Sequence, residues 1–322
     1  MRIIRHWDEP AARLGAVVAL GNFDGVHLGH QAVIAAARRI AEGLGAPAGV
    51  LTFEPHPRQL FRPDDPPFRL TPFRIKARAM EALGLDVLYA LAFDREFSRH
   101  SADAFIADIL VAGFGVRHVV AGADFAFGHR RGGDMALLER RGRALGFGVS
   151  TAAPVTDGEG PISSSRIRRL LEEGKPAEAA RLLGRPWEVE GRVESGHRRG
   201  RTIGFPTANI DLADYLRPAT GVYAVEARLD APDSPTWRGV ANFGRRPTVD
   251  GSSLWLEVHL FDFAGDLYGR HLRVAFREYL RGERKFDGLA ALTAQIAEDA
   301  ARARALLAAL PAAASAAGTS IG

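Results

Sequence analysis

The sequence predicts a two-part fold: an α/β half built on a parallel sheet, followed by an antiparallel β half and a terminal helix. Between residues 16 and 184, continuous apolar runs alternate with segments whose apolar residues recur at helical spacing, as in doubly wound α/β folds. After residue 187 the runs become short and partly alternating, as in antiparallel barrels or sandwiches. We therefore expect domains at 1–184 and 187–310, with a disordered tail at 311–322.

In the first half, each expected strand is short and apolar, and helical segments follow the strands. The expected strands span residues 16–20, 48–53, 86–93, 117–122 and 149–155. The expected helices span residues 30–44, 101–114, 134–147, 164–174 and 176–184. Ser101 is expected to cap the second of these helices, because a serine hydroxyl can accept from a free N–H of the first turn.

In the second half, Gly, Pro and Asp separate the strand-like runs. The expected strands span residues 187–194, 221–229, 237–243, 254–261 and 272–280. The final segment, 286–307, returns to a helical pattern with Leu289, Leu292, Ile296 and Ala300 on one stripe.

The composition is ordinary for a soluble globular protein and is compatible with anionic ligands such as phosphates. The 322 residues carry a net charge of +4, and almost all of the positive charge is arginine, with only Lys76, Lys175 and Lys285 as lysines. There is no cysteine, which excludes disulfides, thiolate metal sites and a cysteine nucleophile. No signal peptide or membrane-spanning run is present, so we expect a cytoplasmic protein with no membrane partner.

The stretch GNFDGVHLGH, residues 21–30, follows an apolar strand and opens a helix. Such a turn presents free backbone N–H groups and the positive end of the helix dipole, which favours phosphate binding. His27 and His30 are close enough in sequence to face one anion, and Gly29 would let the backbone approach it. The alternatives are a zinc pair or two solvated loop histidines.

This stretch looks like the HxGH signature of the nucleotidyltransferase superfamily. Together with FEPHP (53–57) it resembles the N-terminal module of the bacterial bifunctional riboflavin kinase/FMN adenylyltransferases, or FAD synthetases. The further motifs of that family follow in order: GADFAFGHRRGGD (122–134), ISSSRIR (162–168), GRTIGFPTANI (200–210), NFGRRPTV (242–249) and LEVHLFDFAGDLYG (256–269). The resemblance implies a Rossmann-like nucleotidyltransferase domain followed by a flavokinase-like antiparallel barrel.

For the first half, the resemblance implies that the FMN phosphate attacks the α-phosphorus of ATP, giving FAD and pyrophosphate. Catalysis would then be alignment and charge stabilisation, without a protein nucleophile. His27 and His30 would stabilise the triphosphate. The loop would be shaped by Gly21, Phe23 and Gly29.

The other motifs of this half are assigned in the same way. Ser163 and Ser164 would cap a helix whose Arg168 binds phosphate, although by pattern alone a capped helix with solvated arginines is favoured. His56 would lie near the nucleotide. The FMN-binding residues would be Asp124, Phe127 and Arg131, with Arg130 and Arg131 or magnesium screening the carboxylate. Ser165 stands where the family often has threonine, and Asp124 where some relatives carry asparagine.

For the second half, the resemblance implies phosphorylation of riboflavin by ATP. Thr207 and Asn209 would hold Mg²⁺ and the ATP phosphates, with Gly200 in the same motif. Glu257 would be the general base, although a lone glutamate is by default exposed on the outer face of a barrel. Arg281, in the charged run RGERKF, would border riboflavin.

Two other functions compete with this interpretation. The chain could retain only one of the two activities, against which all the named motif residues of both modules are present. It could also be a nucleic-acid-binding protein, since HxGH domains occur in aminoacyl-tRNA synthetases. However, there is no KMSKS-like motif and no run of aromatics interleaved with basic residues, so we expect no nucleic-acid partner. The sequence does not fix the oligomeric state.

Overall fold

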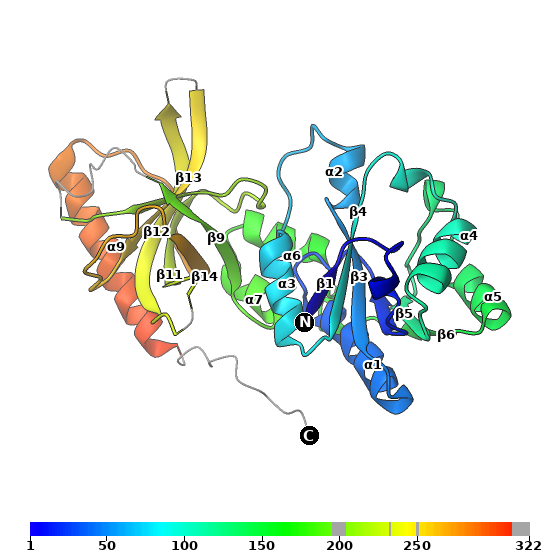
Figure 1. Cartoon of the computed structure of the whole chain (residues 1–322). Helices are drawn as coiled ribbons and strands as arrows, with labels where there is room; N and C mark the ends of the chain where they lie inside the picture. The colour runs from blue at the N-terminus through cyan, green and yellow to red at the C-terminus, as the bar shows by residue number, and fades with distance from the viewer. Residues whose placement is uncertain (195–203, 232, 249–250, 311–322) are drawn as a thin grey trace. The chain divides into compact units, whose positions relative to one another are not determined.

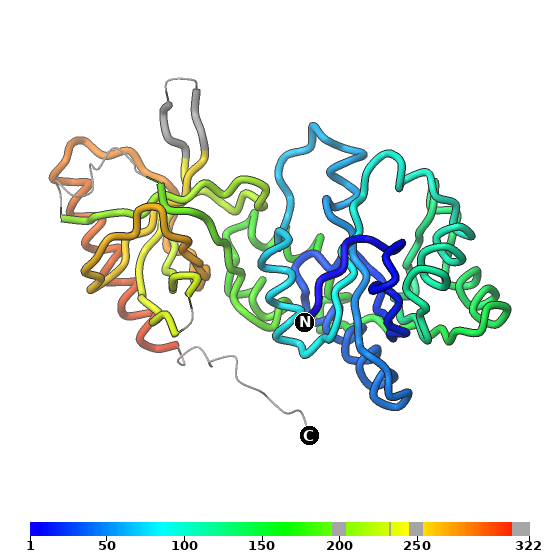
Figure 2. The backbone as a smooth tube through the Cα atoms, viewed as in Figure 1, coloured from blue at the N-terminus to red at the C-terminus, as the bar shows by residue number. Residues whose placement is uncertain are grey.

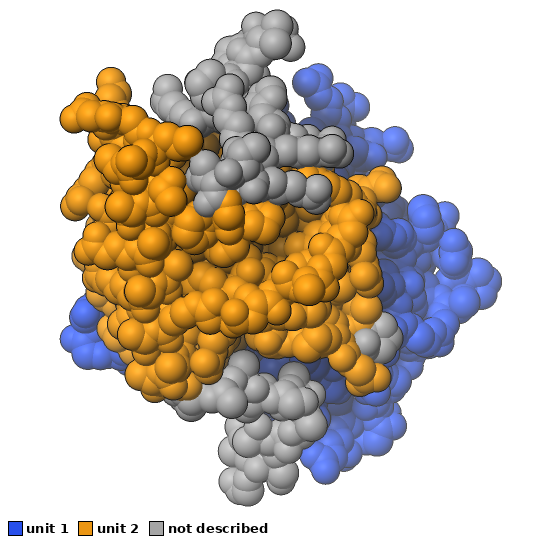
Figure 3. Space-filling view, turned by 90° about the vertical axis from the view of Figure 1, so that its left-hand side faces the viewer, with its two compact units in different colours: residues 1–66, 71–163 blue, residues 67–70, 164–322 orange. Residues whose placement is uncertain are grey.

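The computed structural model describes residues 1–194, 204–231, 233–248 and 251–310, which form two compact units (Figures 1 and 2). Unit 1 comprises residues 1–66 and 71–163, and unit 2 comprises 67–70 and 164–310 (Figure 3). By contacts the later part of unit 2 begins at Ser164. The predicted domain limits of 1–184 and 187–310 stay a prediction. Gly200 and the predicted tail at 311–322 lie outside the described residues.

Unit 1 is built on a six-stranded parallel sheet in the order β1-β4-β3-β2-β5-β6, which confirms the predicted fold class. Its strands are β1 (Arg2–Ile4), β2 (Val17–Leu20), β3 (Ala48–Glu54), β4 (Val87–Ala92), β5 (His118–Gly122) and β6 (Gly148–Ala152). A small hairpin, β7 (Thr156–Asp157) and β8 (Gly160–Pro161), follows the sheet. The sequence pattern does not predict β1 or this hairpin.

Helices cover both faces of this sheet (Figure 1). They are α1 (Leu28–Leu44), α3 (Phe73–Ala82), α4 (Ala102–Ala104), the π-helix η3 (Phe105–Gly113) and α5 (Met135–Leu145). The short helix α2 (Pro57–Phe61) follows the end of β3 and buries no residue. Along β2, Val17 and Ala19 share a core with α1 and α3, whereas Val18 and Leu20 share a core with η3 and α5. A strand covered on both sides must be apolar on both sides, which explains the continuous apolar run.

The segment predicted as one helix over 101–114 is a short α-turn that continues as a π-helix. Ser101 caps it as expected, because its hydroxyl accepts from the N–H of Ala104 at 3.0 Å. The widened turns join residues five apart, such as Phe114 N–H and the Ile109 carbonyl at 2.9 Å. Both of these side chains are fully buried, so the wider turn serves the core.

Unit 2 contains a closed antiparallel barrel in the order β10-β13-β12-β11-β14-β9, so the barrel is confirmed over the sandwich. Its strands are β9 (Trp187–Glu194), β10 (Ala208–Asp211), β11 (Gly221–Leu229), β12 (Trp237–Thr248), β13 (Gly251–Leu260) and β14 (His271–Arg281). Alternate apolar residues of the strands, among them Phe243, Leu256 and Phe276, are fully buried and fill the barrel.

In the described part of unit 2, three helices accompany the barrel. The helix α9 (Leu289–Ala309) contacts β11, β12 and β14 and shares a small core with Val222, Ala224 and Val240. The helices α6 (Ser164–Glu172) and α7 (Pro176–Leu183) contact each other, and α7 contacts β14 and β9. These contacts explain why both helices belong with the barrel. No helix of the described ranges is long and apolar enough to cross a bilayer.

Candidate active sites

The sheet of unit 1 has its topological switch point between β2 and β5. From β2 the chain proceeds to β3 and β4 on one side, then crosses to β5 and β6 on the other. In open α/β sheets, ligands bind beyond the carboxyl ends of the strands at such a point, where consecutive loops diverge and leave a crevice. The two loops that leave this point are residues 21–27 and 123–134. They contain the predicted phosphate turn and the predicted FMN loop.

His27 and His30 form a stacked pair at the start of α1. His27 is the N-cap residue, and its Nδ1 accepts from the backbone N–H of His30 at 3.3 Å. The neutral ring of His27 therefore carries its proton on Nε2. The two ring centroids are 3.6 Å apart with planes 18° from parallel, and the Phe23 ring lies edge-on to His30 at 5.2 Å. The predicted pairing of the two imidazoles at a helix N-terminus is thus present.

The glycines of this turn make room for neighbouring rings. A Cβ on Gly29 would lie 3.1 Å from Cε1 of His27 and 3.3 Å from the Ile162 carbonyl oxygen. A Cβ on Gly21 would lie 3.1 Å from the Phe23 ring. Gly29 therefore has a packing reason of its own, in addition to the predicted approach of the backbone to a ligand.

The described residues group no third metal ligand with the histidine pair. Within the described ranges, no group of three or more His, Asp or Glu side chains gathers as a metal site. A structural zinc ion takes four protein ligands and a catalytic zinc ion three, so the zinc alternative for His27 and His30 has no support in this part of the chain.

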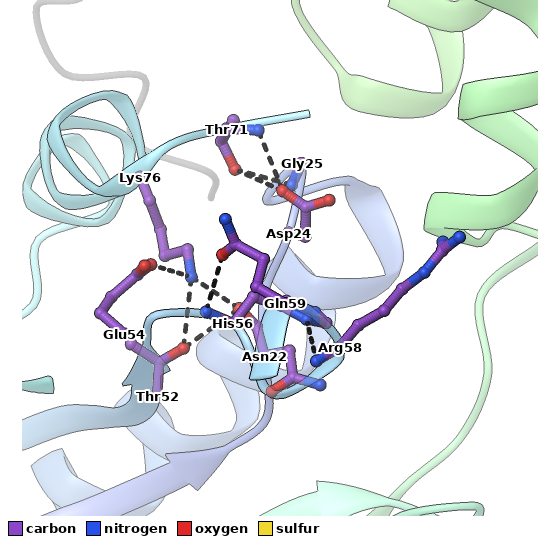
Figure 4. Close-up of polar contacts among 10 residues, drawn as sticks. All are labelled: Asn22, Asp24, Gly25, Thr52, Glu54, His56, Arg58, Gln59, Thr71 and Lys76. Carbon is purple, nitrogen blue, oxygen red and sulfur yellow. Dashed lines mark hydrogen bonds and ion pairs between the residues drawn. The ribbon is translucent and has the colours of Figure 1, made fainter. Parts of the chain in front are cut away.

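His56 begins the helix α2 by a reciprocal cap. Its Nδ1 accepts from the N–H of Arg58 at 3.1 Å, and Oε1 of Gln59 accepts from the N–H of His56 at 3.0 Å (Figure 4). The predicted position of His56 near the nucleotide stays a prediction, whereas its capping role is a function that the motif did not reveal.

The predicted FMN loop is held in an unusual backbone conformation. Gly128, Arg130 and Arg131 all have φ between 53° and 73°, a region that side chains other than glycine rarely adopt. Asp124 is exposed, whereas Phe127 is 6 % exposed and packs against the ring of Phe105 at 5.4 Å.

Phe127 therefore packs in the core of unit 1, and its contact with FMN stays a prediction. Phe125, which the sequence reasoning did not single out, is half-buried and stacks on Phe127 with ring centroids 5.7 Å apart. The alternation Phe-Ala-Phe in the motif is the signal that could have identified it, because residues two apart in an extended segment share a side.

The ISSSRIR element spans the division between the units. Ser163 ends unit 1, and α6 begins at Ser164 in unit 2, so the predicted helix start is correct. Nε of Arg168 donates to the Phe68 carbonyl at 2.8 Å, and its guanidinium lies 5.3 Å from the Phe68 ring centre. These contacts fix the orientation of the fork that is predicted to bind phosphate.

On the barrel, Glu257 lies in a row of polar side chains. In the register of the sheet, Glu257 is opposite Asn209 of β10 on one side and opposite Asn242 of β12 on the other. Directly opposed residues share a face, and the neighbours Leu256 and Val258 fill the interior. The row therefore lies on the outer face, as expected for Glu257.

This row brings together two of the predicted kinase residues. Asn209 is 3 % exposed, whereas Glu257 and Thr207 are half-buried, with Thr207 two residues before Asn209 along the chain. The other amide of the row, Asn242, is a member of the NFGRRPTV motif that was not assigned a role. Strand pairing, which a single sequence does not reveal, is what identifies it.

A second carboxylate, that of Glu283 in the charged run after β14, lies beside the strand β12. A Cβ on Gly244 would lie only 2.0 Å from Oε1 of Glu283, and 3.2 Å from the amide nitrogen of Asn242. Gly244 thus gives Glu283 room beside the polar row. Burial, and then the negative charge of Glu283, raise the pKa of the Tyr279 hydroxyl, which donates to the Thr220 carbonyl at 3.0 Å.

Arg281, the predicted riboflavin neighbour, is engaged in a buried ion pair. Its Nε and Nη2 donate to the carboxylate of Asp299 on α9 at 2.7–3.0 Å, and its Nη1 donates to the Gly282 carbonyl. The two side chains are 13 % and 7 % exposed. Its riboflavin contact stays a prediction, but a structural role is present.

The two halves of the chain match two enzyme families. Residues 9–166 match the FAD synthetase family, and residues 183–307 match the riboflavin kinase family. A crystal structure from Streptococcus pneumoniae, described as a macrolide-efflux protein, is 33% identical with a TM-score of 0.81. The match covers 92% of this chain and 96% of that one.

Curated relatives match along nearly their whole length. The bifunctional riboflavin kinase/FMN adenylyltransferase of Escherichia coli strain K12 is 43% identical, with 94% of this chain and 97% of the relative covered. Its namesake from Pseudomonas fluorescens is 45% identical, with 96% and 98% covered. That from Bacillus subtilis strain 168 is 41% identical, with 88% and 90% covered. The chain therefore belongs to the family of bifunctional riboflavin kinase/FMN adenylyltransferases.

Proposed function

We propose that unit 2 phosphorylates riboflavin to FMN and that unit 1 then transfers the adenylyl group of ATP to FMN. The observation that carries this division is the stacked pair His27 and His30 at the switch point of a parallel sheet, on a chain whose barrel carries the row of Asn209, Glu257 and Asn242. Each unit holds one set of groups suited to one reaction.

In unit 1 the reaction needs no protein nucleophile, because an FMN phosphate oxygen is already anionic. It attacks the α-phosphorus of ATP, and the bond to the pyrophosphate oxygen breaks. Backbone N–H groups at the start of α1, together with Nε2–H of His27 and the ring of His30, stabilise the negative charge that develops. In the proposed assignment Arg168 binds phosphate, while Asp124 and Arg131 border FMN.

In unit 2, Glu257 acts as the general base. Its carboxylate accepts the proton of the terminal ribityl hydroxyl as that oxygen attacks the γ-phosphorus of ATP, and ADP leaves. The amides of Asn209 and Asn242 lie on both sides of Glu257 in the sheet and orient what binds there. The backbone next to Glu257 is part of a closed barrel, which keeps the base in place.

The donor groups at this site fit magnesium. Thr207 supplies a hydroxyl oxygen and Asn209 an amide oxygen, which are the hard ligands that this ion prefers. Magnesium usually binds through few protein ligands and completes its shell with waters and nucleotide phosphates, so no carboxylate cluster is needed. When bound, Mg²⁺ would neutralise charge on the ATP phosphates.

The test is a time course of riboflavin, ATP and magnesium with the purified protein, with flavins separated by chromatography. We expect FMN first and FAD later. His30→Ala should stop at FMN, whereas Glu257→Gln should leave riboflavin unchanged yet convert supplied FMN to FAD. Each rate should fall by about 100-fold or more. Riboflavin untouched by folded wild type, or FAD formed at a normal rate by His30→Ala, would contradict the assignment.

A further inference from the structure

Lys76 is a fully buried lysine on the inner face of α3. Its side chain is 0 % exposed, and the other buried residues of this helix are Ile75, Ala77 and Met80. It is also the one lysine in residues 1–163. An ammonium group in such a place is costly unless it is paired and hydrogen-bonded, so its presence calls for a reason.

The ammonium group of Lys76 links α3 to the strand β3 and to the turn that follows β2 (Figure 4). Nζ lies 2.8 Å from Oε1 of Glu54, 2.9 Å from the carbonyl oxygen of Asn22 and 3.4 Å from Oγ1 of Thr52. An ammonium has three N–H donors, and these partners match that number. Lys76 therefore has its donors directed at the protein, which argues for positioning rather than contact with a substrate.

One of these partners belongs to the turn that carries the histidine pair. Asn22 immediately precedes Phe23, whose ring contacts His30. Phe23 and Val26 have φ of 51° and 45°, conformations that are costly for an aromatic and a β-branched residue. Such a backbone persists only where its surroundings hold it.

A second anchor comes from the same segment. Oγ1 of Thr71 accepts from the N–H of Gly25 at 2.8 Å, and Oδ1 of Asp24 accepts from the N–H of Thr71 at 3.0 Å. Asp24 and Thr71 are both 2 % exposed. The segment from Thr71 to Lys76 is thus hydrogen-bonded to the turn at two points (Figure 4). Lys76 binds its start at Asn22, and Thr71 binds its middle at Asp24 and Gly25.

We propose that Lys76 is a positioning residue for adenylyl transfer. Its ammonium, balanced by Glu54, holds the Asn22 carbonyl and thereby fixes the strained turn in the conformation that presents His27 and His30. A lysine suits this task because one compact nitrogen can donate in three directions, whereas an arginine fork is planar. The proposal rests on the assignment of this turn to adenylyl transfer.

The experiment compares variants of the full chain and uses its riboflavin kinase activity as an internal control for protein amount and for folding of unit 2. Lys76→Met removes the ammonium at similar volume. Lys76→Met/Glu54→Gln removes both charges, so that no unpaired charge stays buried. Met80→Ala, at a residue that is also fully buried on α3 but carries no charge, is the matched control for lost stability.

For each variant, kcat and KM of FAD formation from FMN and ATP are measured beside thermal unfolding. We expect Lys76→Met and the double variant to lower kcat of FAD formation by about 10- to 100-fold, as expected for a misplacement of about 1 Å, with kinase kcat unchanged. Met80→Ala should lower the melting temperature and keep kcat. Normal kcat in the double variant would overturn the proposal, even if Lys76→Met itself does not fold.

His30→Ala, run in parallel, separates this proposal from the assignment on which it rests. If His30→Ala loses FAD formation while the double variant keeps it, only the role of Lys76 is wrong. If His30→Ala keeps FAD formation, the turn is not the reaction site, and both conclusions fail.

Discussion

Gly128 shows how a single residue shapes the predicted FMN loop. Its φ is 73°, and a Cβ there would lie 2.6 Å from the backbone N and Cα of Ala102. Main-chain atoms of a neighbouring element cannot move aside as a flexible side chain can, so a methyl group would displace the loop itself.

We therefore expect Gly128→Ala to destabilise unit 1 by about 1–3 kcal/mol from backbone strain alone, with the clash added, and to raise KM for FMN. Gly146→Ala is the matched control, because Gly146 also has positive φ, 82°, but nothing lies within 4 Å of its Cβ position. Chemical denaturation and steady-state kinetics compare the two. Equal losses in both would show that the contact with Ala102 is not important.

At the residue scale, the sequence predicts where a site residue lies in its helix or strand better than what its side chain contacts. The positions of His27 and His30 follow from the strand-turn-helix pattern, because such a turn places them at a helix start. Their stacking, the cap made by His56 and the burial of Phe127 depend on neighbours distant in the chain. Arg281 is the clearest case, since its partner Asp299 comes from a helix that packs on the barrel.

At the element scale, the strands and helices with a clear apolar period are recovered, and those without one are missed. The strand β1 has three residues and β10 has four, too few to establish a period. The apolar pattern of α3 is hard to recognise in the sequence because one of its buried positions is Lys76. The charge of Lys76 suggests an exposed position, although its ammonium is buried and paired with Glu54.

The ion pair between Arg281 and Asp299 fastens α9 to the barrel strand β14. Removing one partner of a buried pair leaves the other charge unpaired, so Asp299→Ala should destabilise unit 2 by about 3–5 kcal/mol in a denaturation experiment. Asp262→Asn is the comparison, because Asp262 makes two hydrogen bonds with Arg304 of α9, but in solvent, and asparagine tolerates its φ of 57°. Its loss should have little effect, since exposed pairs are screened.

His118 makes the packing of β5 against β6 sensitive to pH. Its Nε2 lies 2.8 Å from Oγ of Ser150, and burial lowers its pKa below the ordinary 6.5. The unfolded chain therefore binds the proton more readily, so the folded state loses stability as pH falls below about 6.5 and is unaffected above it. Denaturation at pH 7.5 and pH 5 should show a larger loss for wild type than for His118→Gln. Identical losses would contradict this.

At the scale of the whole molecule, the order of the two folds follows from the sequence, but the unit to which α6 and α7 belong does not. Strand-like runs with alternating apolar residues begin near residue 187, whereas the continuous part of unit 2 begins at Ser164. The helical pattern of α6 and α7 is the same whether they cover a sheet or a barrel. The contacts of α7 with β14 and β9, and of α6 with α7, assign both helices to the barrel unit.

Fragments test this boundary. A fragment of residues 164–322, which keeps all of unit 2 except residues 67–70, should phosphorylate riboflavin and form no FAD from FMN. A fragment of residues 187–322 lacks α7, whose Leu182 and Leu183 are buried on a helix that contacts β14 and β9. Each such side chain contributes about 1.5–3 kcal/mol, so the shorter fragment should melt at least roughly 5 °C lower. FAD formed by either fragment would refute the assignment of unit 1.

The four residues 67–70, which belong to the barrel unit, have a consequence for the order of events on the ribosome. The Leu70 carbonyl accepts from Nε1–H of Trp187, a residue 117 positions later in the chain. At about 5–20 residues per second, Leu70 is synthesised roughly 6 to 23 s before its donor exists. All residues of unit 1 have been synthesised by residue 163. Residues 67–70, however, can form this hydrogen bond only after Trp187 of the barrel has been synthesised. The nascent enzyme thus reaches its final hydrogen bonding only when its second half arrives.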